Sequence, residues 1–313
     1  ARGTITVQPE MQGSTTTEPD ILDKISAGHR VILTEFDPPK NLDLDKYIAG
    51  ARALADAGSD ALTLADNSLA ILRMSNIAVG ILLKEMGIQT ILHMSCRDRN
   101  ILGLQSDLLG MAAHGIRHVL PLTGDPAKVG DHPGASSVYD VSSIDLIKII
   151  RQMNEGFSHS GNALKKRPEF VIGCTFNPNA KNLEAQIARL KRKLEAGAKY
   201  VMTQPIFDTA LAQKTAEALR DISVPVFIGV WPLLSGKQAH FLHHEVPGIT
   251  IPDSVQTAMA NLEGAAGVAA GLGIAEEVSR AVLDHFPGIY LITPFLRFEV
   301  TAQLAAYARQ YGK

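Results

Sequence analysis

The stretch VILTEFDPPK, residues 31–40, decides which fold the chain adopts. It begins as a short run of β-forming residues and reaches a carboxylate, Glu35, where that run ends. A second carboxylate, Asp37, follows closely, and the pair of prolines behind it stops a strand from continuing. An acid at the end of an apolar strand needs an explanation. The rest of the chain supplies one, because the same pattern recurs along it.

Short β-forming runs alternate with longer segments of helical periodicity along the chain. The expected strands cover residues 31–36, 60–64, 90–95, 118–122, 170–176, 200–204, 224–230 and 289–293. The expected helices cover residues 44–58, 68–87, 100–115, 182–197, 208–220, 237–245 and 297–308, with two more between Pro252 and His285. Several of these helices begin at Ser or Asn and end at Gly, as capped helices do.

Strands that alternate with helices imply a parallel sheet with right-handed crossovers. Eight such units predict an α/β fold, a single (β/α)8 TIM barrel with extra helices before the last strand. The alternative is an open doubly wound sheet, whose phosphate-binding fingerprint, G-x-G-x-x-G after a strand, is missing. The nearest match, GLGIAE at residues 271–276, lies in an Ala- and Gly-rich helical pattern and indicates close helix packing.

The composition is that of a folded, soluble protein, with 46% hydrophobic and 20% charged residues among 313. The formal net charge of −2 gives no long-range attraction to nucleic acid or to an anionic membrane. No apolar run reaches the roughly 18 residues of a transmembrane helix, and no apolar signal-peptide core is present. Cys96 and Cys174 lie far apart, so we expect no disulfide framework, no Cys-rich zinc site and a cytoplasmic location.

Residues 1–20 differ in composition from the rest of the chain. They are rich in Thr, Ser, Pro and Gly and show little periodicity. This pattern predicts a linker or an extended arm, followed by a barrel domain at residues 21–313. The sequence starts at Ala1 rather than Met, so we expect a processed chain or a module cut from a longer polypeptide.

The active site of such a barrel lies at the C-terminal ends of its strands. Every expected strand leads into at least one polar or charged side chain, and together these side chains would line a large polar pocket. They are Glu35, Thr63, Asp66, Asn67, His93, Ser95, Asp98, Thr123, Gly124, Asp125, Thr175, Asn177, Asn179, Thr203, Gln204, Trp231, Lys237, Gln238, Thr293 and Arg297.

These residue types exclude several chemistries. His93 is the only histidine at a strand end, and His240 with His244 lacks a third ligand, so we expect no metal. No strand ends in Lys, which argues against a Schiff-base aldolase, and neither G-x-S-x-G nor H-E-x-x-H occurs. What remains is a hydroxyl- and amide-rich pocket with two acids, Glu35 and Asp125. Such a pocket suits a planar, nitrogen-rich ligand such as a flavin or a pterin.

The same strand ends carry a resemblance to a known family. The blocks TEFDPPK, DALTLADN, ILHMSCRDRN, GIRHVLPLTGDP, GCTFNPNA, LKRKLEAGAKYVMTQPIFD and GVWPLLSGKQA resemble the flavin-dependent methylenetetrahydrofolate reductases, over residues 21–310. LHMSCRDRN and LITPFLRFEV are most similar to the reductase module of bifunctional bacterial chains that carry a homocysteine S-methyltransferase module first. The resemblance implies an FAD-carrying barrel that reduces 5,10-methylenetetrahydrofolate to 5-methyltetrahydrofolate for methionine biosynthesis, usually with NADH or NADPH as donor.

The resemblance also implies roles for the two acids. Glu35 matches the family's catalytic acid, which protonates a folate nitrogen so that the five-membered ring opens to an iminium ion. Such an acid must be protonated near neutral pH, as burial can arrange. Asp125 matches an aspartate near the flavin and the pterin that can stabilise the cationic iminium. The sequence alone favours two ordinary alternatives. Glu35 would be a salt-bridge residue, and Asp125 would be a turn residue, since Gly-Asp-Pro favours turns.

Binding positions follow from the same match. By resemblance, the FAD contacts are Thr63, His93, Thr123, Gly124, Asp125, Asn177, Ala180 and Lys193. The folate contacts are Gln204, Gln238, Leu242 and Arg297, of which Arg297 is a partner for the glutamate tail. Ordinary alternatives stand beside these roles: a satisfied core histidine for His93, an exposed helix charge for Lys193, and a capping or exposed residue for Arg297.

Two positions depart from the family pattern. Thr123 stands where some relatives have an arginine, and Leu242 stands where some have a phenylalanine that packs on nicotinamide and folate. The electron donor therefore stays open among NADH, NADPH and a protein. The alternative function is a folate-binding or methyl-handling module without its own redox activity, serving a fused or separate partner. The sequence leaves open the oligomeric state, a homo-oligomer included, and the reaction direction.

Overall fold

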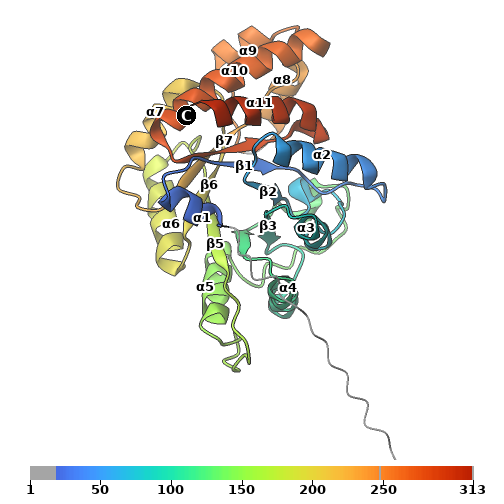
Figure 1. The fold of residues 1–313 in the computed structure, drawn as a ribbon, viewed down its shortest axis with the longest axis vertical. Coiled ribbons are helices and arrows are strands. Elements are labelled where there is room, and N and C mark those ends of the chain that lie inside the picture. Colours follow the sequence, from blue (N-terminus) through green and yellow to red (C-terminus); the bar gives the residue numbers. More distant parts are fainter. Residues whose placement is uncertain (1–18, 247, 312–313) are drawn as a thin grey trace, which may run out of the picture.

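A computed structural model describes residues 19–246 and 248–311. In these residues the strands close into a parallel barrel in sequence order, and the last strand pairs with the first (Figure 1). The predicted eight-stranded barrel is therefore confirmed. The strands are β1 Val31–Glu35, β2 Ala61–Leu64, β3 Thr90–Ser95, β4 His118–Leu122, β5 Val171–Phe176, β6 Tyr200–Ile206, β7 Val226–Val230 and β8 Gly288–Ile292. The arm predicted at residues 1–20 lies outside the described residues, apart from Pro19 and Asp20.

The strands are apolar on both faces because helices cover the barrel and side chains fill its interior. Successive residues of a strand point to opposite faces. Val31, Leu33 and Ile91 belong to the cluster that fills the interior, whereas Ile32 packs in the layer between strands and helices. Glu35 continues the inward series of Val31 and Leu33, so the alternation directs it to the open end of the barrel.

Helices lie between the strands and surround the barrel. They are α1 Ile21–Ser26, α2 Asp45–Asp56, α3 Asn76–Glu85, α4 Ile101–Ala113, α5 Ser143–Asn154, α6 Leu183–Ala196, α7 Thr209–Ala218, α8 Gly236–Glu245, α9 Asp253–Met259, α10 Gly264–His285 and α11 Phe298–Gln310. The two helices predicted before the last strand are α9 and α10, which lie with α8 at one side of the barrel (Figure 1). None of the helices in the described parts of the chain has both the length and the hydropathy of a membrane span.

Helix α1 closes the N-terminal end of the barrel. The Asp20 side chain caps the helix by accepting hydrogen bonds from two backbone N–H groups of its first turn. Ile21 is fully buried in the interior cluster. Asp20 also lies 3.8 Å from the ring of His118, the first residue of β4. The end of the barrel opposite Glu35 is therefore sealed.

The helix predicted at residues 68–87 begins too early. The structure has a short 3₁₀ turn, η1 (Ser68–Ala70), and α3 starts only after its cap Ser75. Leu69 and Ala70 both have a φ of +55°, a left-handed conformation through which a right-handed helix cannot continue. The prediction extended the helix because apolar residues occur across this segment, whereas the backbone turns twice within it.

Helix α5 was absent from the predicted helices, although its start has a clear sequence signature. Ser142 caps the helix and accepts from the N–H of Asp145, whose carboxylate accepts in return from the N–H of Ser142. This capping box, S-x-x-D before an apolar run, marks a helix start. Two other short 3₁₀ turns, η2 (Ala127–Val129) and η3 (Pro294–Leu296), interrupt loops at the C-terminal ends of β4 and β8.

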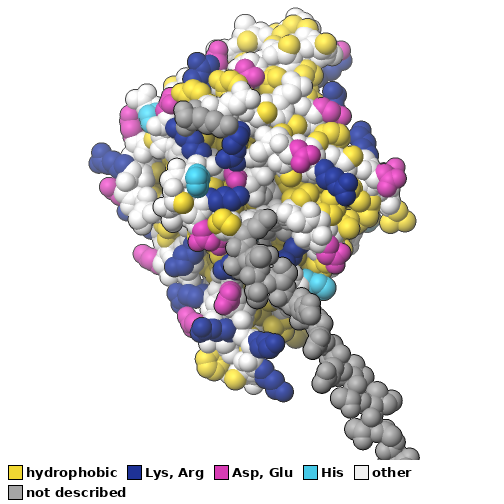
Figure 2. Space-filling model, viewed as in Figure 1, with side chains coloured by type: hydrophobic (Ala, Val, Ile, Leu, Met, Phe, Trp, Pro, Cys, Tyr) yellow, Lys and Arg dark blue, Asp and Glu magenta, His cyan; other side chains and the backbone are white. Residues whose placement is uncertain are grey.

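Charged side chains of both signs are interspersed over the face shown in Figure 2. This distribution agrees with the formal net charge of −2. No broad single-sign field is seen on that face that would attract a highly charged polymer. Function is therefore to be sought at the barrel mouth, where the inward side chains gather.

The barrel interior leaves no room for a side chain at Gly173 in β5, because a Cβ there would lie 2.6 Å from the ring of the fully buried Tyr200. We expect Gly173→Ala to lower the free energy of unfolding, measured by urea denaturation, by about 1–3 kcal/mol. Gly110→Ala in α4 is the matched control, since nothing lies within 4 Å of the added methyl. It should be neutral or stabilise by up to about 1 kcal/mol. Equal effects of the two changes would contradict this account.

Candidate active site

Inward side chains from neighbouring strands meet at the mouth of the barrel. Glu35 is the last residue of β1, and Thr63 lies opposite it on β2. His93 follows on β3, with only 7% of its surface exposed. Tyr290 approaches from β8, the strand on the other side of β1. The strand order thus brings three predicted site residues together and adds Tyr290, which the sequence did not single out.

Glu35 is half-buried, and its carboxyl group accepts a hydrogen bond from the hydroxyl of Tyr290. The pKa of Glu35 is raised to about 8, first by burial and second by the negative charge of Asp37. The Tyr290 hydrogen bond and the positive charge of Arg73 oppose this rise in pKa. At neutral pH the Glu35 side chain is therefore mainly protonated. When it ionises, the Tyr290 hydroxyl can donate a hydrogen bond to the carboxylate.

Asp37, which has no role predicted from the sequence, lies in the loop after β1. Its Oδ2 pairs with Nη2 of Arg73 at 2.8 Å and accepts a hydrogen bond from the Ser68 hydroxyl at 3.0 Å. Burial raises the pKa of Asp37, while Arg73, Ser68 and Lys40 lower it. No local sequence signal reveals this pair, because Arg73 comes from the loop after β2.

His93 is a neutral imidazole at neutral pH. Burial lowers its pKa to about 4, and the nearby charge of Asp66 offsets this only in part. Its Nε2 is buried and has no hydrogen-bond partner among the described residues. The backbone carbonyl of His93 accepts from the Asn76 side chain at 2.7 Å, which fixes the strand beneath the ring. The ring therefore offers a ligand one unused nitrogen.

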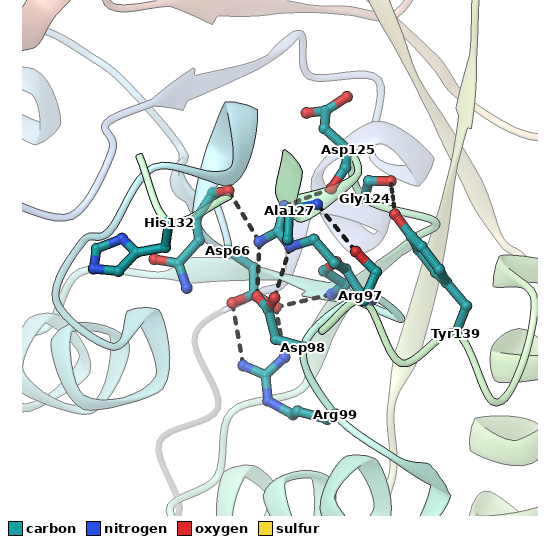
Figure 3. A network of polar contacts seen from close by, with 12 residues as sticks. Asp66, Arg97, Asp98, Arg99, Gly124, Asp125, Ala127, His132 and Tyr139 are labelled. Atoms are coloured by element: carbon teal, nitrogen blue, oxygen red, sulfur yellow. Dashed lines mark hydrogen bonds and ion pairs between the residues drawn. The ribbon is translucent and has the colours of Figure 1, made fainter. Parts of the chain in front are cut away.

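The loop after β4 carries three predicted residues, Thr123, Gly124 and Asp125. Gly124 has a φ of +84°, and a Cβ there would lie 2.1 Å from Oγ of Ser95, so only glycine fits. Thr123 is exposed, and its hydroxyl lies 3.4 Å from the Ser143 hydroxyl. Asp125 is half-buried, and its carboxylate points away from the polar network beneath it (Figure 3).

That network is organised by Arg97, whose side chain is 2% exposed (Figure 3). Its guanidinium makes a bidentate pair with Asp98 at 2.6 and 2.7 Å. The same group donates to the backbone carbonyls of Asn67 and Asp125, each at 3.1 Å. One arginine thus ties the loop after β2 to the loop after β4. Arg97 has no role predicted from the sequence, since both carbonyl contacts are long-range.

A second charge pair supports the same loops. Arg99 binds both carboxylate oxygens of Asp66, at 2.7 and 3.1 Å, while Asp66 also accepts the backbone N–H of Ser95 at 2.8 Å. Tyr139 donates its hydroxyl to the Gly124 carbonyl at 3.1 Å. Asp66 was predicted at the barrel mouth, and its carboxylate oxygens are taken up by these protein contacts.

The loop after β5 carries Asn177 and Ala180, both half-buried. Asn177 accepts the N–H of Asn179 on its side chain at 2.9 Å. Lys193, from α6, is 5% exposed, and its ammonium donates to the carbonyl and hydroxyl of Thr175 at 2.6 and 3.0 Å. Burial lowers the pKa of Lys193 to about 8. Lys193 is therefore not an exposed helix charge, and Thr175 engages it directly.

Gln204 projects from an irregularity in β6. The register between β6 and β7 shifts between Met202 and Pro205, and Gln204 is exposed whereas its neighbours are buried. Thr203 stabilises the break, because its hydroxyl donates to the Gln204 carbonyl at 2.8 Å and accepts the N–H of Gly229 at 2.9 Å. Bulges of this kind re-aim a side chain beside active sites.

The remaining predicted folate contacts come from beyond β7 and β8. Gln238 is 6% exposed, and its Oε1 accepts the N–H of Leu234 at 2.7 Å. Leu242 is 2% exposed and packs in a small apolar cluster beneath α8 and α9. Arg297 is exposed, pairs with Glu299 at 3.8 Å, and lines a cavity of about 720 Å³ between α10 and α11. Leu242 is buried in the apolar cluster, whereas Arg297 lines the cavity, so the predicted folate contacts do not all line one pocket.

Several buried polar atoms at this end of the barrel have no hydrogen-bond partner among the residues that the structure describes. They are Asp37 Oδ1, Thr63 Oγ1, Arg73 Nε, His93 Nε2, Asn179 Oδ1, Trp231 Nε1, Gln238 Nε2 and Thr293 Oγ1. An unpaired buried polar group costs about 1–3 kcal/mol, so a ligand with donors and acceptors is favoured here. A flavin or a pterin has both, so the residues present fit the predicted cofactor and substrate.

Comparisons with known proteins agree with this chemistry. A sequence model of the family described as methylenetetrahydrofolate reductase matches residues 20–305. The chain is 27% identical over 214 residues to a probable methylenetetrahydrofolate reductase (NADPH) of Caenorhabditis elegans, covering 64% of this chain and 30% of that protein. It is 26% identical over 289 residues to methylenetetrahydrofolate reductase (NADH) 1 of Arabidopsis thaliana, covering 85% and 46%. The matched region thus spans less than half the length of these two relatives.

A solved structure shares the fold across nearly the whole chain. It is an uncharacterized protein from Clostridium thermocellum, described as binding two copies of 5-methyl-5,6,7,8-tetrahydrofolic acid. The TM-score is 0.65 at 18% identity, with 92% of this chain and 98% of that chain covered. At this identity the likeness shows the barrel fold alone.

The raised pKa of Glu35 predicts a pH-dependent stability. The folded value of about 8 lies above the ordinary 4.5, so between these values the folded state holds one proton more than the unfolded state. Stability should therefore fall as pH rises through this window, by up to about 1.4 kcal/mol per pH unit from this group. Urea titrations at pH 5 to 8 should show Glu35→Gln gaining on the wild type as pH rises. The exposed Glu85→Gln in α3 should run parallel to the wild type, and a parallel Glu35→Gln would contradict the pKa.

Proposed function

The chain belongs to the methylenetetrahydrofolate reductase family, and from that premise we propose that it reduces 5,10-methylenetetrahydrofolate to 5-methyltetrahydrofolate. The observation that carries the proposal is Glu35, a carboxyl group with a pKa of about 8 at the mouth of the barrel. Buried donors and acceptors without protein partners surround it. An acid of this kind is poised for proton transfer near neutral pH.

Glu35 acts as the general acid. Its proton passes to a folate nitrogen, the bond from that nitrogen to the methylene carbon breaks, and a cationic iminium is left on the substrate. FAD, if bound here and reduced by NAD(P)H, would supply the hydride that converts the iminium carbon to a methyl group. The proton transfer leaves Glu35 as a carboxylate, which the Tyr290 hydroxyl stabilises by its hydrogen bond. Proton donor and anion stabiliser thus sit on adjacent strands.

Asp125 follows β4 at the same end of the barrel as Glu35. Its backbone is held by Arg97, and its own carboxylate is directed away from that arginine (Figure 3). A free carboxylate on a fixed loop stabilises a neighbouring cation without having to reorganise. We therefore assign Asp125 to the stabilisation of the iminium and to a hydrogen bond with the pterin.

The FAD would be held by residues of β2 to β5, of their loops and of α6. We assign this role to Thr63, His93, Thr123, Gly124, Asp125, Asn177, Ala180 and Lys193. His93 supports the assignment best, through its unpaired Nε2. Lys193 would exchange its bonds to Thr175 for a phosphate contact, and the phosphate charge would stabilise an ammonium whose pKa is lowered by burial.

We assign folate binding to Gln204, Gln238, Leu242 and Arg297. Gln238 supports this assignment best, because its Nε2 is a buried donor without a protein partner. NADH or NADPH is the proposed electron donor, as the names of the two relatives differ on this point. The pairing with a homocysteine methyltransferase module and homo-oligomer formation stay predictions.

The test is anaerobic and separates the two half-reactions. The purified protein should bind FAD and turn yellow, and NADH, NADPH and methyltetrahydrofolate should each be tried as reductants of the bound flavin. A protein that stays colourless after incubation with FAD would refute the proposal. Tight folate binding without flavin turnover would instead favour a folate-binding or methyl-handling module.

Glu35→Gln should lower methylenetetrahydrofolate reduction by roughly 10²- to 10⁴-fold, because the amide cannot donate the proton. Reduction of the flavin by NAD(P)H needs no such proton from Glu35, so its rate should change little. Stopped-flow absorbance of the flavin measures both steps. Glu85→Gln, on the exposed face of α3, controls for the loss of a charge. An unchanged folate rate in Glu35→Gln would remove Glu35 from the mechanism.

A further inference from the structure

Two side chains act on Glu35 in opposite directions: Tyr290 on β8 through a hydrogen bond, and Asp37 in the loop after β1 through its negative charge. Tyr290 is 6% exposed and lies on β8, where Leu33 is its register partner. Its ring belongs to the interior cluster, so the hydroxyl is held at the level of the Glu35 carboxyl group rather than swinging in solvent. A phenol O–H donates to a carboxylate and thereby favours the ionised form of Glu35.

Asp37 has the opposite effect and is itself fixed. Its Oδ2 is held by Arg73 at 2.8 Å and by Ser68 at 3.0 Å, and Arg73 is anchored in turn to the Pro38 carbonyl at 3.1 Å. The carboxylate therefore keeps its place beside Glu35 through contacts from the loop after β2. A nearby negative charge disfavours the ionised form of Glu35.

We propose, on the basis of the proposed reduction, that Tyr290 and Asp37 are opposed positioning residues that balance the two protonation states of Glu35. The groups that face Glu35 are Asp37 from its own loop, Arg73 from the loop after β2 and Tyr290 from β8, with Lys40 acting on Asp37. A general acid must hold its proton until substrate arrives and must then exist as an anion. Asp37 serves the first requirement and Tyr290 the second.

Opposed effects on the protonation of Glu35 give a reason for the polar groups of Asp37 and Tyr290 at this place. The Oδ1 of Asp37 is buried without a partner among the described residues, which is a cost that a purely structural ion pair avoids. Tyr290 donates its hydroxyl to Glu35, although its ring lies in an otherwise apolar interior cluster. The hydroxyl is the one polar atom of this side chain, and it is directed at the carboxyl group of Glu35.

Two conservative variants test the inference because their expected effects have opposite signs. The rate of folate reduction should fall as pH rises through the pKa of Glu35, at about 8 in the wild type. Tyr290→Phe removes the donor to the anion, so this alkaline limb should move to higher pH. Asp37→Asn removes the negative charge, so the limb should move to lower pH. We expect shifts of about one pH unit each.

Control variants separate this effect from general damage. Asp43→Asn removes an exposed carboxylate from the same loop and should leave the limb in place. Asp37→Glu keeps the charge and should stay near the wild-type limb, which makes the Asp37 arm informative even where Tyr290→Phe folds poorly. Limbs that move in the same direction, or that do not move, overturn the inference.

A second measurement does not depend on turnover. Infrared titration of the protonated carboxyl band that Glu35→Gln lacks reports the ionisation of Glu35 directly, without folate. Opposed shifts of this titration in Tyr290→Phe and Asp37→Asn support the positioning pair. If these shifts occur in a protein that reduces no folate, the proposed reaction fails and the positioning pair stands. If folate is reduced but neither titration shifts, the positioning pair fails and the reaction stands.

Discussion

The ladder between β8 and β1 turns an open parallel sheet into a ring, and the site depends on that closure. It aligns Leu33 with Tyr290 and Glu35 with Ile292, so Tyr290 lies one inward position before the acid and its hydroxyl reaches the Glu35 carboxyl group. Arg309 reinforces the seam by donating to the carbonyl of Arg30, just before β1. Once the ring is closed, every second side chain must point inward. The chemistry at the mouth follows from which residues fall on that inward series.

Closure alone does not fix the loops that carry the rest of the site. Parallel strands end in loops whose backbone groups need partners, and Arg97 satisfies two of them at once. A buried guanidinium with a bidentate carboxylate partner is held rigidly, since breaking the pair would leave an unpaired charge inside the protein. The loops after β2 and β4 are therefore coupled, and Asp125 is presented to the mouth on a braced backbone. Rigid support of this kind lets a half-exposed carboxylate act as a fixed charge.

Sequence patterns were sufficient to predict the alternating strands and helices of the barrel. They also predicted the location of residues that lie at strand ends. Glu35 and Thr63 were placed correctly at strand ends because a strand boundary is a local property, marked here by Pro38. The helix start at Ser75 was misplaced because the left-handed turns at Leu69 and Ala70 are imposed by neighbouring loops rather than by their own preferences. Arg97, Asp37 and Tyr290 were missed for a related reason. Arg97 and Tyr290 act on groups that are distant in the sequence, and Asp37 is fixed by the distant Arg73, so nothing in the adjacent sequence indicates these contacts.

The same seam has a consequence for how the chain is made. Glu35 and Tyr290 are 255 positions apart, so β1 leaves the ribosome long before its second neighbour exists. At about 5–20 residues per second, the delay is on the order of ten seconds or more. Throughout that time β1 exposes one edge of an apolar strand, the kind of edge that pairs with other chains. The surroundings of Glu35 are thus completed last, and the nascent protein must keep the β8-facing edge of β1 free until β8 is made.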